Sequence, residues 1–426
     1  MSDLNIQVSE EYDPHIPKIL PHEKVYSIQV GYKLFKLSGL SLSSDAPSYF
    51  TRYFSDPKNE DNVLFFDRNP EIFQLIYNHL QGYSINITDD YQFMHVWSDC
   101  FYFGLKNLQN ILTDSDIYAN VGGETFKIPK VLFSGGNSPN YFTTNYDRLL
   151  LDNMNIIEQK EMLRPPPQRP ATIPNRSPTL FKDLLELLRG NDMVIVSDEH
   201  RKLLIRECRY YRFLELEQRL IRHKIIEYGG KPEIILNLLD LTKRGVINVS
   251  PPDKQTEVPL LYTRPHMVKE PARNLIVHIE PTDDYCEVRL SLNRTTKLAT
   301  VKITNRLSTK ITQVFKDYLE GAIISEENDV PTIAFLAGLK DSRCTINGRD
   351  MNSNWIEELF GKSEEQPTKK RKKSDASSSE TKGEIIELRL KKSMWRFMMR
   401  GSLARLHAVA IDAYTDINPE QPIDYL

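Results

Sequence analysis

The chain has 426 residues, of which 40% are hydrophobic and 27% charged, and this ordinary globular composition predicts roughly two to four domains at this length. Its formal net charge of −3 gives the whole chain no basic bias towards nucleic acid, so we expect no nucleic-acid partner. No stretch approaches the roughly 18 consecutive apolar residues of a membrane span. Residues 1–23 lack the apolar core of a signal peptide and are predicted to be a flexible N-terminus.

The cysteines and histidines show no spacing that is typical of a metal site or a disulfide framework. None of Cys100, Cys208, Cys286 and Cys344 has a CxxC neighbour, and none of the nine histidines lies at metal-ligand spacing from another. The motifs GxSxG, HExxH and GxGxxG are also missing. We therefore expect no metal, no cofactor and no enzymatic activity.

Two stretches of the N-terminal half look like copies of one another. Residues 28–35 and 119–126 each place Val-Gly at the bend of a predicted strand–turn–strand unit, with Phe four residues after the Gly. Glycine adopts a positive φ at such a bend without a Cβ penalty. Further matches follow in constant register: Phe35 with Phe126 at an offset of 91, Phe50 with Phe142 at 92, and Pro70, Phe73, Gly82, Cys100 and Tyr102 with Pro178, Phe181, Gly190, Cys208 and Tyr210 at 108. This order predicts two related domains, at 24–113 and 117–228.

The change of offset from 92 to 108 means that the second copy contains 16 additional residues. They fall near 147–169, a segment that contains the triple proline 165–167. Because consecutive prolines cannot lie inside a helix or a central strand, we expect an inserted surface loop. A spacer is the simpler interpretation of this loop than a ligand for a proline-binding module.

Each copy also contains the pattern of a capped amphipathic helix. Residues 69–82 begin with Asn-Pro, continue with apolar residues at helical spacing and end at Gly, and residues 177–190 repeat this pattern with Ser-Pro. His79 lies on the apolar stripe of the first helix. We interpret it as a hydrogen-bonded core histidine rather than a ligand.

Three motifs resemble the potassium-channel tetramerisation branch of the BTB/POZ family. They are the strand, Asp-Arg and helix cap at 63–70, the closing helix Asp-Cys-Phe-Tyr-Phe-Gly-Leu at 99–105, and the Asn-Val-Gly-Gly opening at 120–123. The resemblance covers about 24–112 and 117–226, roughly half of the chain, and implies a tandem-domain, fungal-type member without a channel. The first copy has Gly-Tyr where the family has Gly-Gly, and the zinc-binding His and Cys cluster of some channel members is absent.

The resemblance implies a fold class and a mode of action. We expect an α+β protein with two tandem BTB/POZ-like domains followed by a β-rich α+β C-terminal domain. Such domains bind copies of themselves or other proteins through polar faces, and Asp67, Arg68, Asn120 and Arg176 occupy the matching positions. The alternative is that Asp67 pairs locally and Arg68 lies in solvent. The two copies could also pack on each other within one chain.

After residue 228 the chain changes character. Residues 229–272 are predicted to be a short helix, at 232–241, followed by a proline-rich linker. Period-two alternation of apolar residues then predicts strands at 275–279, 286–292, 300–303 and 332–336, with a helix at 311–319 and further strands near 388–390 and 406–411. We expect residues 273–426 to form one α+β domain.

A polar loop at 362–383 interrupts that domain. It contains the five basic residues Lys369, Lys370, Arg371, Lys372 and Lys373, lies beside serines and has no aromatic residue, a composition typical of disorder. The basic run matches a nuclear import signal, while a solubilising charge run and non-specific polyanion binding are the alternatives. The expected location is therefore the nucleus, the cytoplasm or both.

Three functions remain open. The first is a non-catalytic, self-associating scaffold or regulator, because channel-less members of the family usually act so and fungal members are linked to stress and nutrient signalling. The second is a substrate adaptor of a cullin-type ubiquitin ligase, for which 219–243 is the only candidate for a helical extension. The third is an enzyme of unknown type in the C-terminal domain. The expected partners are the chain itself and other proteins, with a cullin under the second hypothesis.

Overall fold

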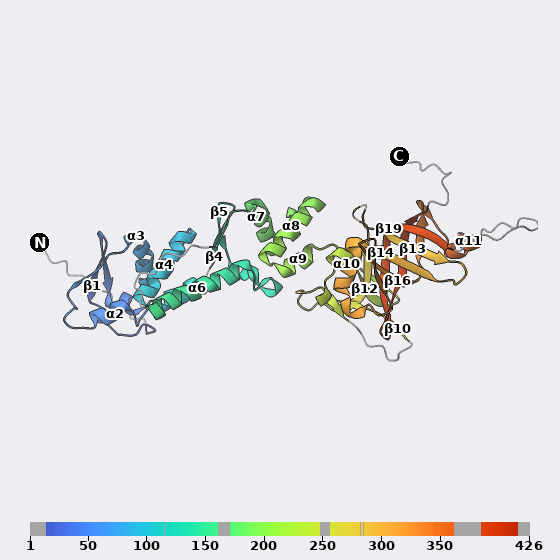
Figure 1. The fold of residues 1–426 in the computed structure, drawn as a ribbon. Coiled ribbons are helices and arrows are strands. Elements are labelled where there is room, and N and C mark those ends of the chain that lie inside the picture. The colour runs from blue at the N-terminus through green and yellow to red at the C-terminus, as the bar shows by residue number, and fades with distance from the viewer. Residues whose placement is uncertain are drawn as a thin grey trace, which may run out of the picture. The chain divides into compact units, whose positions relative to one another are not determined.

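The computed structural model describes residues 14–114, 116–160, 171–247, 256–281, 283, 285–361 and 385–415. The chain divides into two compact units, Met1–Glu217 and Gln218–Leu426, whose elements are labelled in Figure 1. Among the described residues, no helix combines the length and the hydropathy that a bilayer crossing requires.

Unit 1 begins with a three-stranded sheet that is covered by helices on one face. Its elements are β1 (Val25–Val30), β2 (Lys33–Ser38), α1 (Gly39–Ser43), α2 (Tyr49–Phe54), β3 (Val63–Phe66), α3 (Pro70–Leu80), α4 (Asp90–Phe103) and α5 (Lys106–Asp114). The order is β2–β1–β3, with β1 antiparallel to β2 and parallel to β3. Tyr26, Ile28 and Val30 of β1 are buried and the residues between them are not, as expected for a sheet with one covered face.

The first residues before this sheet are packed rather than flexible. Leu20 is 2% exposed, and its backbone N–H donates a hydrogen bond to Ser43 Oγ at 3.3 Å. His22 is buried as well. The predicted flexible segment 1–23 is therefore wrong at these positions, because Leu20 is buried beside α1, whereas residues 1–13 lie outside the described part of the chain.

The second half of unit 1 repeats the topology of the first. Its elements are β4 (Ile117–Val121), β5 (Glu124–Ile128), the short 3-10 helices η1 (Lys130–Phe133) and η2 (Gly135–Asn137), α6 (Tyr141–Lys160), β6 (Ala171–Ile173), α7 (Pro178–Leu188), η3 (Asp192–Val194), α8 (Asp198–Tyr211) and α9 (Leu214–Leu220). The order is β5–β4–β6, again with one antiparallel and one parallel pair on the first strand. The two halves also share a cis peptide bond at matching positions, Ala46–Pro47 and Ser138–Pro139.

The cores of the two halves use equivalent aromatic residues. Phe50 and Phe73 lie with ring centroids 6.0 Å apart in the first half, and their counterparts Phe142 and Phe181 lie 5.1 Å apart in the second. All four rings are completely buried. The offsets read from the sequence therefore correspond to equivalent places in space.

Much of the additional segment of the second half is helical. α6 runs from Tyr141 to Lys160, whereas its counterpart α2 ends at Phe54. Phe142, Tyr146 and Leu150 recur at four-residue spacing on the buried face, and the first proline comes only at 165, so nothing stops the helix earlier. The predicted loop is therefore wrong over 147–160, and residues 161–170 lie outside the described part of the chain.

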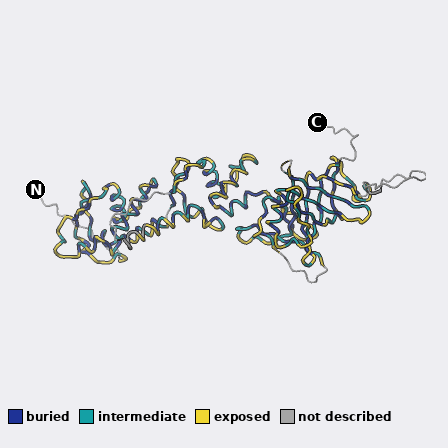
Figure 2. The backbone as a smooth tube through the Cα atoms, viewed as in Figure 1, coloured by how far each residue is buried: buried dark blue, intermediate teal, exposed yellow. Residues whose placement is uncertain are grey.

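Unit 2 is a β-rich domain in which five strands close on themselves. Its elements are β7 (His223–Tyr228), β8 (Lys231–Asn237), β9 (Val246–Ile247), β10 (Glu257–Pro259), β11 (Leu261–Tyr262), β12 (Arg273–Ile279), β13 (Val288–Asn293), β14 (Ala299–Thr304), α10 (Asn305–Val314), β15 (Ile323–Glu327), β16 (Val330–Gly338), β17 (Arg343–Ile346), β18 (Arg349–Asp350), α11 (Trp355–Gly361), β19 (Ile385–Arg400) and β20 (Leu403–Tyr414). β19 pairs with β13, β13 with β14, β14 with β16, β16 with β20, and β20 with β19, which closes a barrel. Along β13 and β14 buried residues alternate with half-buried ones, and Figure 2 colours the backbone by this burial.

The long strand β19 belongs to the barrel and to an adjoining sheet. Its beginning pairs with β13 and its later part with β12, while β20 follows it along the other edge. The register shifts between Leu390 and Lys392, and the buried positions change phase there from even to odd numbers: Ile386, Leu388 and Leu390 are buried before the bulge, and Ser393, Trp395, Phe397 and Met399 after it. One bulge residue therefore keeps the apolar side of a bent strand towards the core.

The segment 229–272 is part of this domain, so the predicted helix and linker are wrong. Residues 231–237 form β8, which pairs in parallel with β12, and β9, β10 and β11 join the same sheet. Ile234, Leu236 and Leu238 are buried at period two, although Ile-Ile-Leu-Asn-Leu-Leu fits a helical face equally well. The parallel pairing with β12, which lies about forty residues later, selects the strand over the helix.

Candidate protein-interaction site

The Val-Gly motif at the start of each half places a glycine in a hairpin where no larger residue fits. Gly31 and Gly122 have φ of +54° and +60°, and their N–H groups donate to the carbonyls of Phe66 and Ile173, both at 2.9 Å. A Cβ on Gly122 would lie 2.5 Å from the carbonyl oxygen of Arg176. The hairpin therefore lies directly against the Arg-x-Pro segment, and only glycine fits there.

The two candidate arginines make the same internal contacts. Arg68 donates to the carboxylate of Asp99, and its guanidinium lies 3.9 Å from the ring centre of Tyr102. Arg176 repeats this arrangement at an offset of 108, with Glu207 at 2.9 Å and the ring of Tyr210 at 3.8 Å. Each arginine therefore links the start of one helix, α3 or α7, to the next helix.

The ion pair of Arg68 and Asp99 is largely withdrawn from water. The side chains of Arg68 and Asp99 are 14% and 8% exposed, so the alternative that Arg68 lies in solvent is wrong. Burial raises the pKa of the Asp99 carboxyl, and the Arg68 guanidinium counteracts part of this rise. The sequence signal for these contacts is an acidic residue and a tyrosine that both repeat at the offset of the arginines.

The other two candidates lie at the ends of strands. Asp67 is exposed, immediately before Arg68. Asn120 is half-buried, and its side-chain oxygen accepts a hydrogen bond from Gly123 N at 3.1 Å, which closes the second hairpin. The structure therefore does not gather the four candidates on one surface, and their role in partner binding stays a prediction.

Both halves also contain a buried polar side chain that accepts hydrogen bonds from the start of a later helix. This arrangement was not predicted from the sequence. The buried carboxylate of Asp45 accepts from the N–H groups of Asn107 and Leu108, at 2.9 and 3.0 Å, at the start of α5. His79 Nε2 lies 3.2 Å from the same carboxylate, which confirms that His79 is a hydrogen-bonded histidine. In the second half Asn137, at an offset of 92, accepts from Leu216 N at 2.9 Å, so the alignment of the copies contained this signal.

The two halves of unit 1 contact each other through different surfaces. The first half contributes the loop before α4 and the first turn of this helix, and the second half contributes the outward side of β4 and β5. Tyr118 stacks on Phe93 with ring centroids 5.2 Å apart and donates from its hydroxyl to Ile87 O at 3.0 Å. Lys127 Nζ lies 3.4 Å from the same carbonyl oxygen. Tyr146 of α6 adds a ring contact with Phe93.

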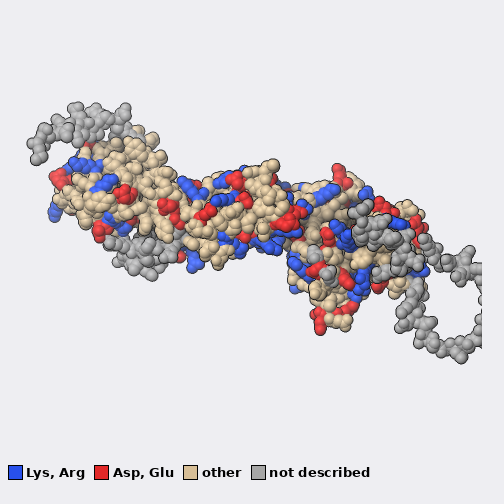
Figure 3. Space-filling view, turned by 90° about the horizontal axis from the view of Figure 1, so that it is seen from above, with Lys and Arg blue, Asp and Glu red and all other residues tan. Residues whose placement is uncertain are grey.

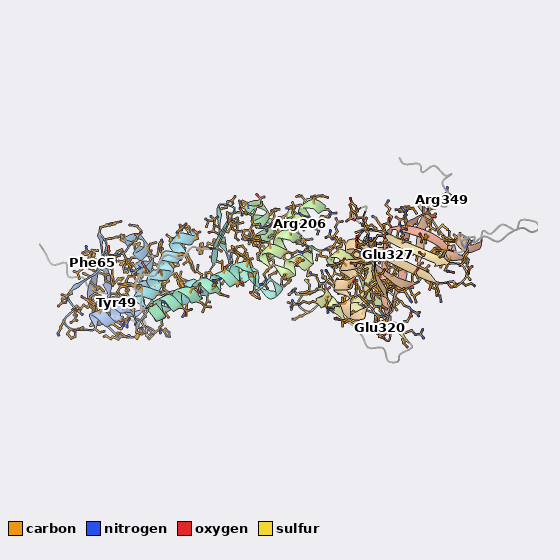
Figure 4. All side chains as sticks on the ribbon, viewed as in Figure 1. Tyr49, Phe65, Arg206, Glu320, Glu327 and Arg349 are labelled. Carbon is orange, nitrogen blue, oxygen red and sulfur yellow. The ribbon has the colours of Figure 1, made fainter. Side chains whose placement is uncertain are left out.

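The outward faces of the two sheets differ in polarity. On the β2–β1–β3 sheet, Val25, Leu34, Val63 and Phe65 are exposed, and Phe65 is labelled at the surface in Figure 4. In the other sheet the corresponding register positions of Leu34 and Phe65 are polar, namely Thr125 and Thr172. The first sheet therefore presents an apolar face that its counterpart lacks.

On the face of the molecule that Figure 3 shows, charge does not single out a binding surface. In the space-filling view, basic and acidic side chains are interspersed over the face that is shown (Figure 3). Lys369–Lys373, the predicted import signal, lie outside the described residues.

Unit 2 contains an open cleft of about 790 Å³ between β17, β18 and the middle of β19 and β20. Its titratable lining includes His278, Cys344 and Asp412, and Asp412 accepts a hydrogen bond from Thr345 Oγ1 at 2.8 Å. Burial raises the pKa of the Cys344 thiol to about 12 and lowers the pKa of His278, so both groups are neutral at neutral pH. Among the described residues, no group of three or more His, Cys, Asp or Glu is arranged to hold a metal ion.

The predicted helical extension at 219–243 is wrong. Beyond the end of α9, the strands β7 and β8 form an antiparallel hairpin there. Tyr228 lies at its tip, and Arg396 packs on the Tyr228 ring at 4.6 Å while forming a two-pronged ion pair with the buried Glu233, at 2.8 Å for both bonds. These long-range contacts favour a strand over a helix.

Comparison with known proteins identifies two parts of the chain. The BTB/POZ domain family matches residues 27–112, and the family described as "YLR108C C-terminal domain" matches residues 231–419. The "Uncharacterized protein YDR132C" of Saccharomyces cerevisiae is 48% identical over 260 residues, which are 56% of this chain and 52% of that protein. The "BTB/POZ domain-containing protein YLR108C" of the same yeast is 39% identical over 234 residues, 54% of this chain and 48% of that protein.

The chain spans about half the length of the curated relatives that it matches. The first match agrees with the resemblance seen in the strand, Asp-Arg and closing-helix motifs, and the second includes β8 to β20. Residues 27–112 therefore form a BTB/POZ domain, residues 231–419 match the YLR108C C-terminal domain family, and one of the two yeast relatives is described as a BTB/POZ domain-containing protein.

Proposed function

We propose that the chain is a non-enzymatic scaffold or regulatory adaptor that self-associates and binds other proteins through its N-terminal unit. BTB/POZ domains mediate protein–protein interaction, and this family membership supports the proposal. The observation that carries it is the exposed apolar face of the β2–β1–β3 sheet, formed by Val25, Leu34, Val63 and Phe65. Exposed apolar patches on a folded domain commonly mark interaction sites.

The second half of unit 1 is, in this proposal, a divergent second BTB/POZ-like domain. The family match covers residues 27–112, so the assignment of residues 117–220 depends on internal geometry. Equal strand order, equal pairing directions and the repeated arginine–acid–tyrosine cluster support it. The intramolecular contact at Tyr118 and Phe93 would then be a pairing of two related domains within one chain.

The native mass of the purified full chain tests self-association. Sedimentation velocity at micromolar concentration is expected to give a mass of more than one chain. A mass of a single chain over the accessible concentration range would contradict the proposal.

Affinity purification with mass spectrometry separates the scaffold from the adaptor of a cullin-type ligase. The adaptor remains the second candidate, and stoichiometric recovery of a cullin would favour it. The hairpin at His223–Asn237 occupies the place of the expected helical extension, so we expect other proteins in the purification and no stoichiometric cullin.

We further propose that the basic run directs nuclear import. Its support is compositional: five consecutive basic residues in a polar, serine-rich segment. Replacement of Lys369–Lys373 by alanine in the full chain should move a fluorescent fusion from the nucleus to the cytoplasm. An unchanged distribution would favour the solubilising role instead.

The non-enzymatic part of the proposal concerns the cleft of unit 2. A thiol nucleophile must be a thiolate, and the buried Cys344 has a pKa near 12 instead. This supports a structural role for Cys344. Turnover that is abolished by substitution of a residue lining this cleft would overturn the proposal.

A further inference from the structure

The contact between the two halves of unit 1 joins two unlike surfaces. One is the loop before α4, represented by Ile87 O, and the other is the outward side of the second sheet, represented by Tyr118 and Lys127. Because the halves are equivalent, each has both surfaces. A contact of this kind uses only one surface of each half, so one loop and one sheet face are left over.

The offsets of the repeat locate the two unused surfaces. An offset of 91 carries Tyr118 and Lys127 back to Ser27 and Lys36, on the outward side of the β2–β1–β3 sheet. An offset of 108 carries Ile87 forward to Ile195, in the loop between α7 and α8. The first half therefore has the unused sheet face, and the second half has the unused loop.

Both unused surfaces are apolar and exposed. On the sheet, Leu34 is 50% and Phe65 is 58% exposed. In the loop, Met193 is 89% and Val196 is 82% exposed, and Val194 and Ile195 are half-buried between them. In contrast, Ile87, the counterpart of Ile195 in the occupied loop, is only 6% exposed.

We propose that a second copy of this chain occupies these surfaces. The loop Met193–Val196 of one chain docks on the outward face of the β2–β1–β3 sheet of another, and thus repeats between chains the contact that the halves make within a chain. Lys36 takes the position of Lys127 and donates to Ile195 O of the other copy. The inference rests on the proposed self-association and names the faces that carry it.

The charges beside the two surfaces fit this pairing. Asp198 and Glu199 occupy the first turn of α8, directly after the loop, and Lys36 is exposed on the sheet. An acidic helix start that meets a lysine is favourable electrostatically. Since each chain carries one loop and one sheet face, two chains can use all four surfaces.

A complementation experiment tests the head-to-tail arrangement with two variants of the full chain. The sheet variant, Leu34→Thr with Phe65→Thr, introduces the residues that occupy the equivalent register positions of the second sheet, so the fold tolerates them. The loop variant is Met193→Asp with Val196→Asp. All four changes are at exposed positions, so the far-ultraviolet circular dichroism spectrum of each variant is expected to match that of the wild type.

The native masses give the result. Each variant alone is expected to be a single chain, because every contact between copies then contains one altered surface. An equimolar mixture is expected to form a particle of two chains, one of each kind, since the loop of the sheet variant and the sheet of the loop variant are both intact. The control Val131→Asp, at a residue that is 77% exposed and outside both surfaces, should keep the wild-type mass.

The experiment distinguishes a failure of the head-to-tail inference from a failure of self-association. If the wild type has more than one chain and the variants assemble as it does, or if the mixture remains single chains, the head-to-tail inference is overturned and self-association stands. If the wild-type protein is a single chain, self-association itself is refuted.

Discussion

Removal of the Arg68 guanidinium should destabilise the first domain in a way that depends on pH. Arg68→Met removes the cation that pairs with Asp99, whose side chain is only 8% exposed. Breaking a buried ion pair from one side typically costs about 3–5 kcal/mol. Asp99 can limit this loss by taking up a proton, and the loss is then set by the cost of protonating a carboxylate with an unfolded-state pKa of about 3.9, which is about 4 kcal/mol at pH 7.

The sign of the pH dependence follows from this protonation. In the variant, the pKa of Asp99 in the folded state lies above its unfolded value, because burial raises it and no cation opposes the rise. The folded state then binds more protons than the unfolded state, so stability is highest below the unfolded pKa and falls as pH rises, by up to about 1.4 kcal/mol per pH unit. We expect a loss of about 3–4 kcal/mol at pH 7 and about 1–2 kcal/mol at pH 5.

Urea denaturation at the two pH values, followed by circular dichroism, measures this loss. Two controls accompany it. Arg148→Met removes one partner of an exposed pair with Asp152, 3.7 Å apart, and should change stability by less than about 0.5 kcal/mol. Adding Asp99→Asn to Arg68→Met removes the titrating group and should abolish the pH dependence. A loss of under about 1 kcal/mol that is equal at both pH values would refute the internal role of Arg68.

Three further predictions concern other parts of the chain. Gly122→Ala should lose about 2 kcal/mol or more in urea denaturation, because its Cβ would lie 2.5 Å from a carbonyl oxygen, whereas Gly190→Ala, with a φ of +92° but open space around it, should lose only about 1–2 kcal/mol. Glu233→Gln removes the buried carboxylate that pairs with the half-buried Arg396 and should cost about 3–5 kcal/mol, while the exposed Glu327→Gln should cost less than about 1 kcal/mol; equal losses would contradict the assignment. Alkylation of Cys344 by iodoacetamide at about pH 8 should be slowed in proportion to the small unfolded fraction, and its neutral thiol should contribute stability that is lost only as pH rises from about 8.5 towards 12.

The repeated architecture of unit 1 could be predicted because its signals are local. A glycine bend, an Asn-Pro or Ser-Pro helix start and an apolar stripe each occupy a few consecutive residues, and their register along the chain is preserved. The partners of Arg68 and Arg176 come 31 residues later, so no local pattern contained them. The shared offset of Asp99 and Glu207, which was not used in the sequence analysis, is the signal that could have indicated these ion pairs.

The sequence predictions for 232–241 and 147–160 were wrong. In the first of these segments, contacts with residues far away in the sequence decide the structure. Residues 231–237 have the composition of either a helix or a strand, and the parallel partner β12, together with the ion pair from Glu233 to Arg396, selects the strand. Because of the triple proline at 165–167, the predicted loop began at residue 147, which is too early in the chain. α6 runs from Tyr141 to Lys160; its buried face is apolar as far as Leu150, and the sequence has no proline between residue 141 and residue 165.

The order in which the barrel strands of unit 2 occur in the sequence affects when the barrel can close during translation. β19 and β20 supply three of the five pairings of the barrel with β13, β16 and each other, and they are the last of its described strands in the sequence. During translation, one edge of β13 stays unpaired until residues 385–389 of β19 have followed. On β16, whose edge is partly covered by β15, Ala337 and Gly338 wait for residues 406–407 of β20. The sheet of the BTB/POZ domain, in contrast, is complete once residue 66 has emerged, so the N-terminal domain can fold on the nascent chain while the barrel is still incomplete.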